Sequence, residues 1–203
     1  MTIVPEFELL SPSDLRERDV DLLLREELYV SEGFQQFFFS FFGERFNDAE
    51  FVCARHSVDR YEGESDLEID LKCSGQPIRL LVEDKIDAQF QKGQAERYTK
   101  AGDHYVNKLE CNEFLTVLVA PKSYLAESTH GFHKTIELEE ILKWFQSDPS
   151  PRNRYKASLL RSIIDKLEAD RPKDPKITQF WEGYFRSRKS DRQKTRDAET
   201  GRT

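Results

Sequence analysis

The fold is decided by residues 66–85, which read DLEIDLKCSGQPIRLLVEDK. The opening DLEIDLK alternates charged and apolar side chains, and this period of two is typical of a strand with one buried face. The SGQP sequence at 74–77 then favours a turn, and the run IRLLVEDK at 78–85 predicts a second strand. The stretch as a whole predicts a β-hairpin.

The hydropathy pattern on either side of this hairpin predicts a layered α/β architecture. A strand is expected over 51–58, and the apolar run at 114–120, which ends before Pro121, predicts a strand buried on both faces. The segments that repeat apolar side chains at helical spacing are predicted as helices. They are 15–28, 31–42 with its stripe of phenylalanines, 89–104, 138–145, 155–167 and a last patch around Phe180, Trp181 and Phe185.

The length and the net charge of the chain limit the classes of protein to which it can belong. The chain has 203 residues and a formal net charge of −7, which fits one domain of ordinary size and on its face argues against nucleic acid as a partner. The charge is uneven, because residues 151–203 hold 15 basic and 8 acidic side chains. We expect a core over 1–150, a helical extension packed on it over 151–186, and a basic, disordered tail over 187–203.

The sequence predicts a soluble, cytoplasmic protein with no membrane contact. No stretch approaches the ~18 apolar residues of a membrane helix, and residues 1–10 show no basic and then apolar leader. The cysteines are Cys53, Cys73 and Cys111, an odd and widely spaced set that fits a reducing compartment better than a disulfide framework.

Charged residues stand where the two hairpin strands meet. Asp66 opens the first of these strands, and Glu83 and Lys85 end the second. Because side chains alternate across a strand, Glu83 and Lys85 are expected on one face and Asp84 on the other. Two carboxylates at a strand end suit a hard cation such as Mg²⁺, and a neighbouring lysine can orient a water molecule or offset charge that grows on a phosphate.

This spacing, Asp66 followed by a hairpin and Glu83-x-Lys85, resembles the PD-(D/E)XK nuclease superfamily. Gln94 and Tyr98 resemble the glutamine-x-x-x-tyrosine helix motif of its exonuclease-like branch. The longer string GESD, VEDKIDA and QAERY is similar to small bacterial members of the superfamily, and the resemblance spans roughly residues 15–120. It implies a restriction-endonuclease-like core, with a helix, a three-stranded antiparallel meander, a helix and a further strand, to which C-terminal helices are added.

The resemblance also implies an activity, the hydrolysis of DNA phosphodiester bonds by water that Mg²⁺ activates, with Mn²⁺ able to substitute. Asp66 and Glu83 would hold the metal, Lys85 would position the nucleophile, and Gln94 would support the catalytic site. Members of the superfamily often place a glutamate of the first helix near the metal. Glu26 and Glu27 compete for this role, and the inward stripe of the helix favours Glu27.

Further expectations concern the substrate. The side chains of Tyr98, Arg97 and Lys92 are candidates for contacts to nucleic acid, and a homodimer would supply the two sites that cleavage of both strands requires.

Two features depart from the family pattern: Ser65 replaces proline, and Asp84 adds a charge inside the triplet of residues 83–85. A β-bulge that exposed Asp84 would shift the metal ligand by one residue. The alternative function is a catalytically inactive domain of the same fold that binds nucleic acid or protein.

Overall fold

The structure is a computed structural model, and it describes residues 15–60, 63–85, 93–126 and 131–170. Chain contacts divide the protein into two units, Met1–Glu168 and Ala169–Thr203. The fold and the site described below belong to the first unit. The predicted aromatic patch around Trp181, the predicted basic tail and Lys92 lie outside the described residues.

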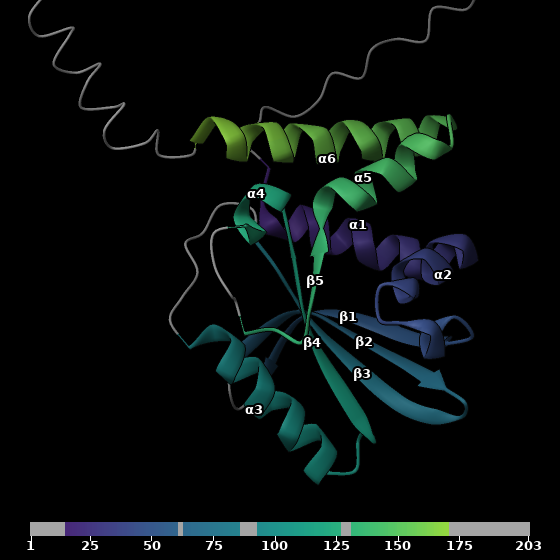
Figure 1. The fold of residues 1–203 in the computed structure, drawn as a ribbon, viewed down its shortest axis with the longest axis vertical. Helices are drawn as coiled ribbons and strands as arrows, with labels where there is room; N and C mark the ends of the chain where they lie inside the picture. Colours follow the sequence, from purple (N-terminus) through teal and green to yellow (C-terminus); the bar gives the residue numbers. More distant parts are fainter. Residues whose placement is uncertain (1–14, 61–62, 86–92, 127–130, 171–203) are drawn as a thin grey trace, which may run out of the picture. The chain divides into compact units, whose positions relative to one another are not determined.

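A five-stranded mixed sheet forms the centre of the first unit, in the order β1-β2-β3-β4-β5. The first three strands are an antiparallel meander, and β4 and β5 continue the sheet in parallel. The predicted α/β architecture and the predicted hairpin are therefore observed (Figure 1). The strands are β1 (Glu50–Arg60), β2 (Gly63–Cys73), β3 (Gln76–Asp84), β4 (Glu113–Ala120) and β5 (Lys134–Glu137).

The hairpin between β2 and β3 turns over two residues. Cys73 pairs with Gln76, and the residues between them, Ser74 and Gly75, have φ angles of 50° and 78°. Two positive φ values in a two-residue loop match the twist of antiparallel strands, and glycine adopts that conformation at little cost. The turn therefore fixes the register by which β2 and β3 pair.

Helices cover both faces of the sheet. The inward side chains of β2, β3 and β4 form one core cluster with residues of α1, α2, α5 and α6, while Leu81 of β3 packs with Tyr98 and Tyr105 of α3 in a second cluster. Helix α3 thus lies on the face opposite α1 and α2 (Figure 1). The helices are α1 (Glu17–Val30), α2 (Glu32–Ser40), a 3-10 turn (Glu44–Phe46), α3 (Gln94–Asn107), α4 (Lys122–Leu125), α5 (Leu138–Ser147) and α6 (Pro151–Asp170).

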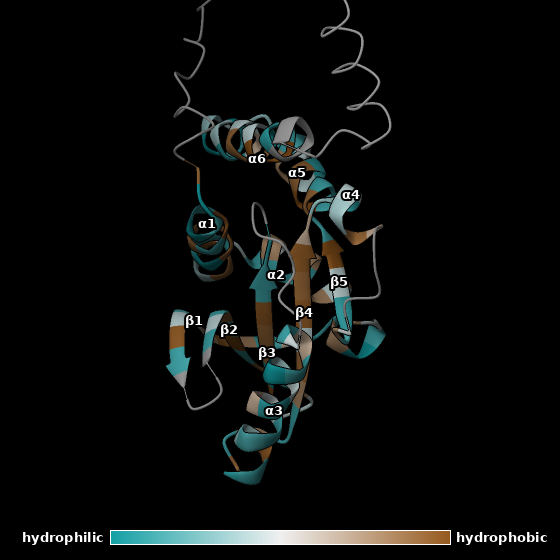
Figure 2. Ribbon diagram, turned by 90° about the vertical axis from the view of Figure 1, so that its left-hand side faces the viewer, coloured by the Kyte–Doolittle hydropathy of each residue, from teal (hydrophilic) through white to brown (hydrophobic). Residues whose placement is uncertain are grey.

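Strand β4 is largely apolar on both sides, as predicted. Most of β4 is coloured as hydrophobic, whereas β3 becomes hydrophilic at its end (Figure 2), and the last five residues of β4 are buried. Helix α3 begins later than predicted, because Gly93 has a left-handed φ of 82° that a continuing helix does not allow. Strand β5 was not predicted, since four residues are too few for a period of two to be recognised.

The phenylalanine stripe of α2 is core, as expected. Phe34 is fully buried, and its ring lies 5.8 Å from that of Phe145 in α5 and 5.0 Å from that of Trp144. Helix α6 joins the same cluster through Leu160 and Ile163. Across the described ranges, none of the helices, the 20-residue α6 included, combines the length and apolar character that a membrane crossing needs.

Candidate functional site

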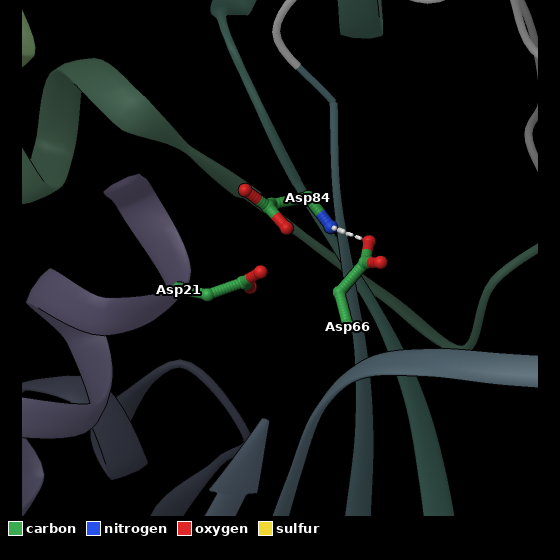
Figure 3. Close-up of side chains that lie close together, drawn as sticks. All are labelled: Asp21, Asp66 and Asp84. Carbon is green, nitrogen blue, oxygen red and sulfur yellow. Dashed lines mark hydrogen bonds between the residues drawn. The ribbon is translucent and has the colours of Figure 1, made fainter. Parts of the chain in front are cut away.

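The candidate site lies where the pairing of β2 with β3 ends. Leu67 of β2 and Val82 of β3 are the last paired residues. Asp66, which precedes Leu67, and Glu83, which follows Val82, are therefore neighbours just beyond the end of the pairing. An Asp66 carboxylate oxygen accepts a 3.1 Å hydrogen bond from the backbone N–H of Asp84 (Figure 3). The backbone N–H of Lys85 donates to the carbonyl of Val119 in β4 at 3.0 Å, so the end of β3 is held from both sides.

Five of the predicted site residues meet on the α3 side of this strand end. Glu83 is buried and accepts hydrogen bonds from the Gln94 amide and from the Tyr98 hydroxyl, the latter at 2.5 Å. It also forms an ion pair with Lys85. The Tyr98 hydroxyl in turn accepts from the backbone N–H of Asp66 at 3.2 Å. Gln94 and Tyr98 stand four residues apart on α3, which brings both side chains to the same helix face.

A second group of acids lies beside the first. Asp21 of α1, Asp66 and Asp84 each offer a carboxylate oxygen, and these oxygens lie within 4.8 Å of one another (Figure 3). Asp84 is fully buried, and among the described residues neither of its carboxylate oxygens has a hydrogen-bond partner. Asp21 is 4% exposed, and its Oδ1 atom likewise has no partner within the described ranges. Two of these three acids, Asp21 and Asp84, were not among the predicted metal ligands.

A sequence signal for Asp21 existed. This residue stands three positions before Leu24 and seven before Leu28, both fully buried, so it occupies an inward position of the amphipathic helix. An acid at an inward position indicates a partner or a site. Asp84 was expected on the face opposite Glu83, and it lies there, but nothing in its own strand indicated what it faces.

Glu27 is buried as predicted, but it does not belong to this group. Its carboxylate forms a 2.7 Å ion pair with Arg152 and accepts a hydrogen bond from Lys156, both in α6. Glu26, the other candidate, is half exposed and pairs with the same two cations. The placement of Glu27 near the metal therefore requires correction: its charge is neutralised by α6, and Asp21 is the acid that α1 brings to the strand end.

Burial and mutual repulsion raise the pKa of all three acids in the group. Burial, and then the charges of Glu83 and Asp21, raise the pKa of Asp66 to about 8. Burial raises the pKa of Asp21 to about 6, and burial with the nearby Asp21 raises that of Asp84 well above its usual range. Such carboxyls share protons unless a cation replaces them. Buried oxygen donors without partners therefore fit a hard divalent cation such as Mg²⁺ or Mn²⁺.

Lys85 and Tyr98 keep their protons in this environment. Burial opposes the charge of Lys85, but Glu83 and Glu17 outweigh it and raise the pKa of the ammonium group. Burial and the charge of Glu83 raise the pKa of Tyr98 well above its ordinary value. Lys85 therefore stays a cation and Tyr98 stays a hydrogen-bond donor. Arg97, another predicted nucleic-acid contact, lies on α3 between Gln94 and Tyr98 and is partly exposed.

The chain matches no protein-family model, no curated protein and no solved structure. A function for this site therefore rests on its own residues and on the spacing of its motifs.

Proposed function

We propose that this protein is a metal-dependent nuclease with a restriction-endonuclease-like core, which hydrolyses DNA phosphodiester bonds. The observation that carries the proposal is the convergence of Asp66, Glu83, Lys85 and Gln94 from three separate elements at one end of the sheet. These are the residues that the motif resemblance implies. The order of helices, a three-stranded meander, α3 and a parallel strand supports the fold part of the proposal.

The metal would be held by carboxylates around Asp66. Glu83 adjoins Asp66 on the α3 side, and Asp21 and Asp84 adjoin it on the α1 side. When bound, Mg²⁺ supplies a positive charge that lowers the pKa of a water molecule and offsets charge on the phosphate. The acids of the site suit this ion, because they are oxygen donors, and among the described residues the buried Asp84 carboxylate has no hydrogen-bond donor to offset its charge.

Lys85 and Gln94 would act on the reacting groups. The Lys85 ammonium is fixed beside Glu83 and can donate a hydrogen bond to a phosphate oxygen, where it would stabilise negative charge that develops during attack. The Gln94 amide nitrogen donates to Glu83, but the buried Gln94 Oε1 atom has no hydrogen-bond partner among the described residues. This oxygen is therefore available to accept a hydrogen bond from the attacking water and orient it.

Tyr98 would be a positioning residue. It binds the Glu83 carboxylate and the backbone of Asp66 at once, so it fixes the two strand ends relative to each other. DNA as the substrate rests on the motif resemblance alone. A cation at the acidic site would reverse the local repulsion between the carboxylates and the phosphate backbone.

The test is cleavage of supercoiled and linear plasmid by the purified full-length protein in Mg²⁺, in Mn²⁺ and in EDTA. We expect cleavage with either metal and none in EDTA. Lys85→Ala should lower the rate by about 100-fold or more, because it removes a charge aimed at the transition state. Lys100→Ala, which removes an exposed lysine of α3, is the matched control and should cleave like the wild type.

Cleavage that persists in EDTA, or that Lys85→Ala leaves unchanged, would refute the proposal. Folded protein that binds DNA but does not cut it under any of these conditions would instead support the inactive binding domain.

A further inference from the structure

The two acids at the end of β3 have different surroundings. Both oxygens of Glu83 are occupied, Oε1 by the Gln94 amide and the Lys85 ammonium, and Oε2 by the Tyr98 hydroxyl. Lys85 also balances the charge of Glu83. A metal ion bound by Glu83 would have to compete with these donors. Glu83 is therefore a saturated acceptor that holds three side chains in place.

Asp84 has the opposite surroundings. Its side chain is fully buried, yet both carboxylate oxygens lack a hydrogen-bond partner in the part of the chain that the structure describes. A buried carboxylate without a donor is costly, so this arrangement needs either a proton or a cation. Asp21 has the same deficit at its Oδ1 atom, and it reaches the site from a different element.

The group formed by these two acids and Asp66 comes close to the dimensions of a site for one ion. One carboxylate oxygen of each acid lies within 4.8 Å of the others. The carboxylates of Asp21 and Asp84 approach one another, and that of Asp66 lies beside them, against the backbone N–H of Asp84 (Figure 3). Oxygens bound to one octahedral Mg²⁺ at 2.0–2.1 Å are about 3 Å apart when adjacent and about 4 Å apart when opposite. The three carboxylates would therefore have to draw closer together around a bound ion.

We infer that the cation of this site is held by Asp21, Asp66 and Asp84. Asp84, the middle residue of the triplet 83–85, supplies the ligand from β3 that the motif resemblance gives to Glu83. Glu83 instead positions Lys85 and the α3 side chains. The inference rests on the proposed metal-dependent function and specifies which carboxylates of that site bind the metal.

The experiment measures Mn²⁺ binding to the full-length protein by isothermal titration calorimetry and by the electron paramagnetic resonance signal of free Mn²⁺. Asp84→Asn and Glu83→Gln each remove one charge without changing side-chain shape. We expect Asp84→Asn to weaken binding by more than about 100-fold and Glu83→Gln by about 10-fold or less, as for loss of a ligand and of a supporting group. Asp103→Asn, on an exposed residue of α3, is the control and should bind like the wild type.

Thermal unfolding separates loss of binding from loss of the fold. Without metal, Asp84→Asn should melt at or above the wild-type temperature, because it removes a buried carboxyl that lacks a donor. Added Mn²⁺ should raise the melting temperature of the wild type and of Glu83→Gln, but not that of Asp84→Asn.

The inference is overturned if the wild type binds no Mn²⁺, or if Asp84→Asn retains binding and Glu83→Gln loses it. The plasmid assay is read separately. If Mn²⁺ binding depends on Asp84 but the protein does not cleave DNA, the ligand assignment stands and the nuclease function is refuted. If the protein cleaves DNA but Mn²⁺ binding depends on Glu83 and not on Asp84, the nuclease function stands and the ligand assignment is refuted.

Discussion

Tyr98 makes the clearest single-residue link between the two sides of the site. Its hydroxyl donates to the Glu83 carboxylate and accepts from the backbone N–H of Asp66. The Tyr98 ring packs in the second core cluster, with Leu81 and Tyr105, and lies 5.5 Å from the ring of Phe132. Its hydrogen bonds can therefore be removed while the packing of the ring is kept.

Tyr98→Phe should lower the free energy of unfolding by about 1–2 kcal/mol, because a buried carboxylate loses a donor and a backbone N–H loses its acceptor. If the protein is a nuclease, kcat should fall while KM stays close to the wild-type value, since Tyr98 positions Glu83 and the backbone of Asp66 and would not itself bind the substrate. Urea unfolding and steady-state cleavage measure the two effects. A change in KM alone would show that Tyr98 contacts the nucleic acid directly.

The acids around Asp66 make stability depend on pH. In the folded protein, burial and the charges of Glu83 and Asp21 raise the pKa of Asp66 from its ordinary value of 3.8 to about 8. Between these values the folded state binds more protons than the unfolded state, so the free energy of unfolding falls as pH rises from about 4 to about 8. Asp21, whose pKa is about 6, adds to the fall only in the lower part of this range.

Urea unfolding in EDTA at pH 5, 6.5 and 8 should show this decline, and Asp66→Asn should flatten its upper half. Excess Mn²⁺ should stabilise the protein more at pH 8 than at pH 5, because metal binding requires the deprotonated carboxylates. Stability that rises over the same range in EDTA would contradict the raised pKa of these groups.

At the scale of elements, α3 is set against β4 by a close approach at Gly102. A Cβ atom placed on Gly102 would overlap the ring of Phe114 in β4. The absence of a side chain therefore lets α3 lie near the sheet, which is what brings Gln94 and Tyr98 within reach of Glu83.

Gly102→Ala should destabilise the protein by about 1–3 kcal/mol, because the added methyl group forces the helix or the ring to move. Gly33→Ala in α2 is the matched control. Its new Cβ would meet only the Ser31 hydroxyl at 4.0 Å, so the better helix propensity of alanine should leave stability equal or raise it by about 0.5–1 kcal/mol. Equal effects of the two substitutions in thermal unfolding would show that the approach of α3 is not tight.

The elements also show what could be predicted from the sequence. Alternation along β2 and β3 was sufficient to place Asp66 beside Glu83 and to put Asp84 on the other face. The acid that meets Asp84 could not be found in this way. Asp21 and Glu27 both occupy inward positions of α1, about 9 Å apart along the helix axis. Only the packing of α1 against the sheet and α6 decides which of them lies at the strand end.

At the scale of the molecule, α1 is joined to α6 by buried charge. Glu27 is fully enclosed and pairs with Arg152 and with the buried Lys156. More than 120 residues separate the partners, as the Lys156–Glu27 hydrogen bond spans 129 positions. These ion pairs fix the helix that carries Asp21, although they do not touch the acidic group themselves.

Lys156→Met should destabilise the protein by about 2–4 kcal/mol, because Glu27 then keeps only the half-exposed Arg152 as a partner. Adding Glu27→Met should recover part of the loss, since the double variant buries no unpaired charge. A double-mutant cycle from urea unfolding measures the coupling. Independent, additive losses would show that the two side chains do not interact in solution.

The ion pair between Glu27 and Lys156 also has a consequence for folding during translation. Asp21, Asp66 and Asp84 are all translated early, but the ion pair between the helix that carries Asp21 and α6 can form only when Lys156 has left the ribosome. A nascent chain therefore holds all three carboxylates well before this link to α6 exists. If the protein binds a metal as proposed, we expect the bound ion to be held firmly only late, once nearly the whole described fold exists.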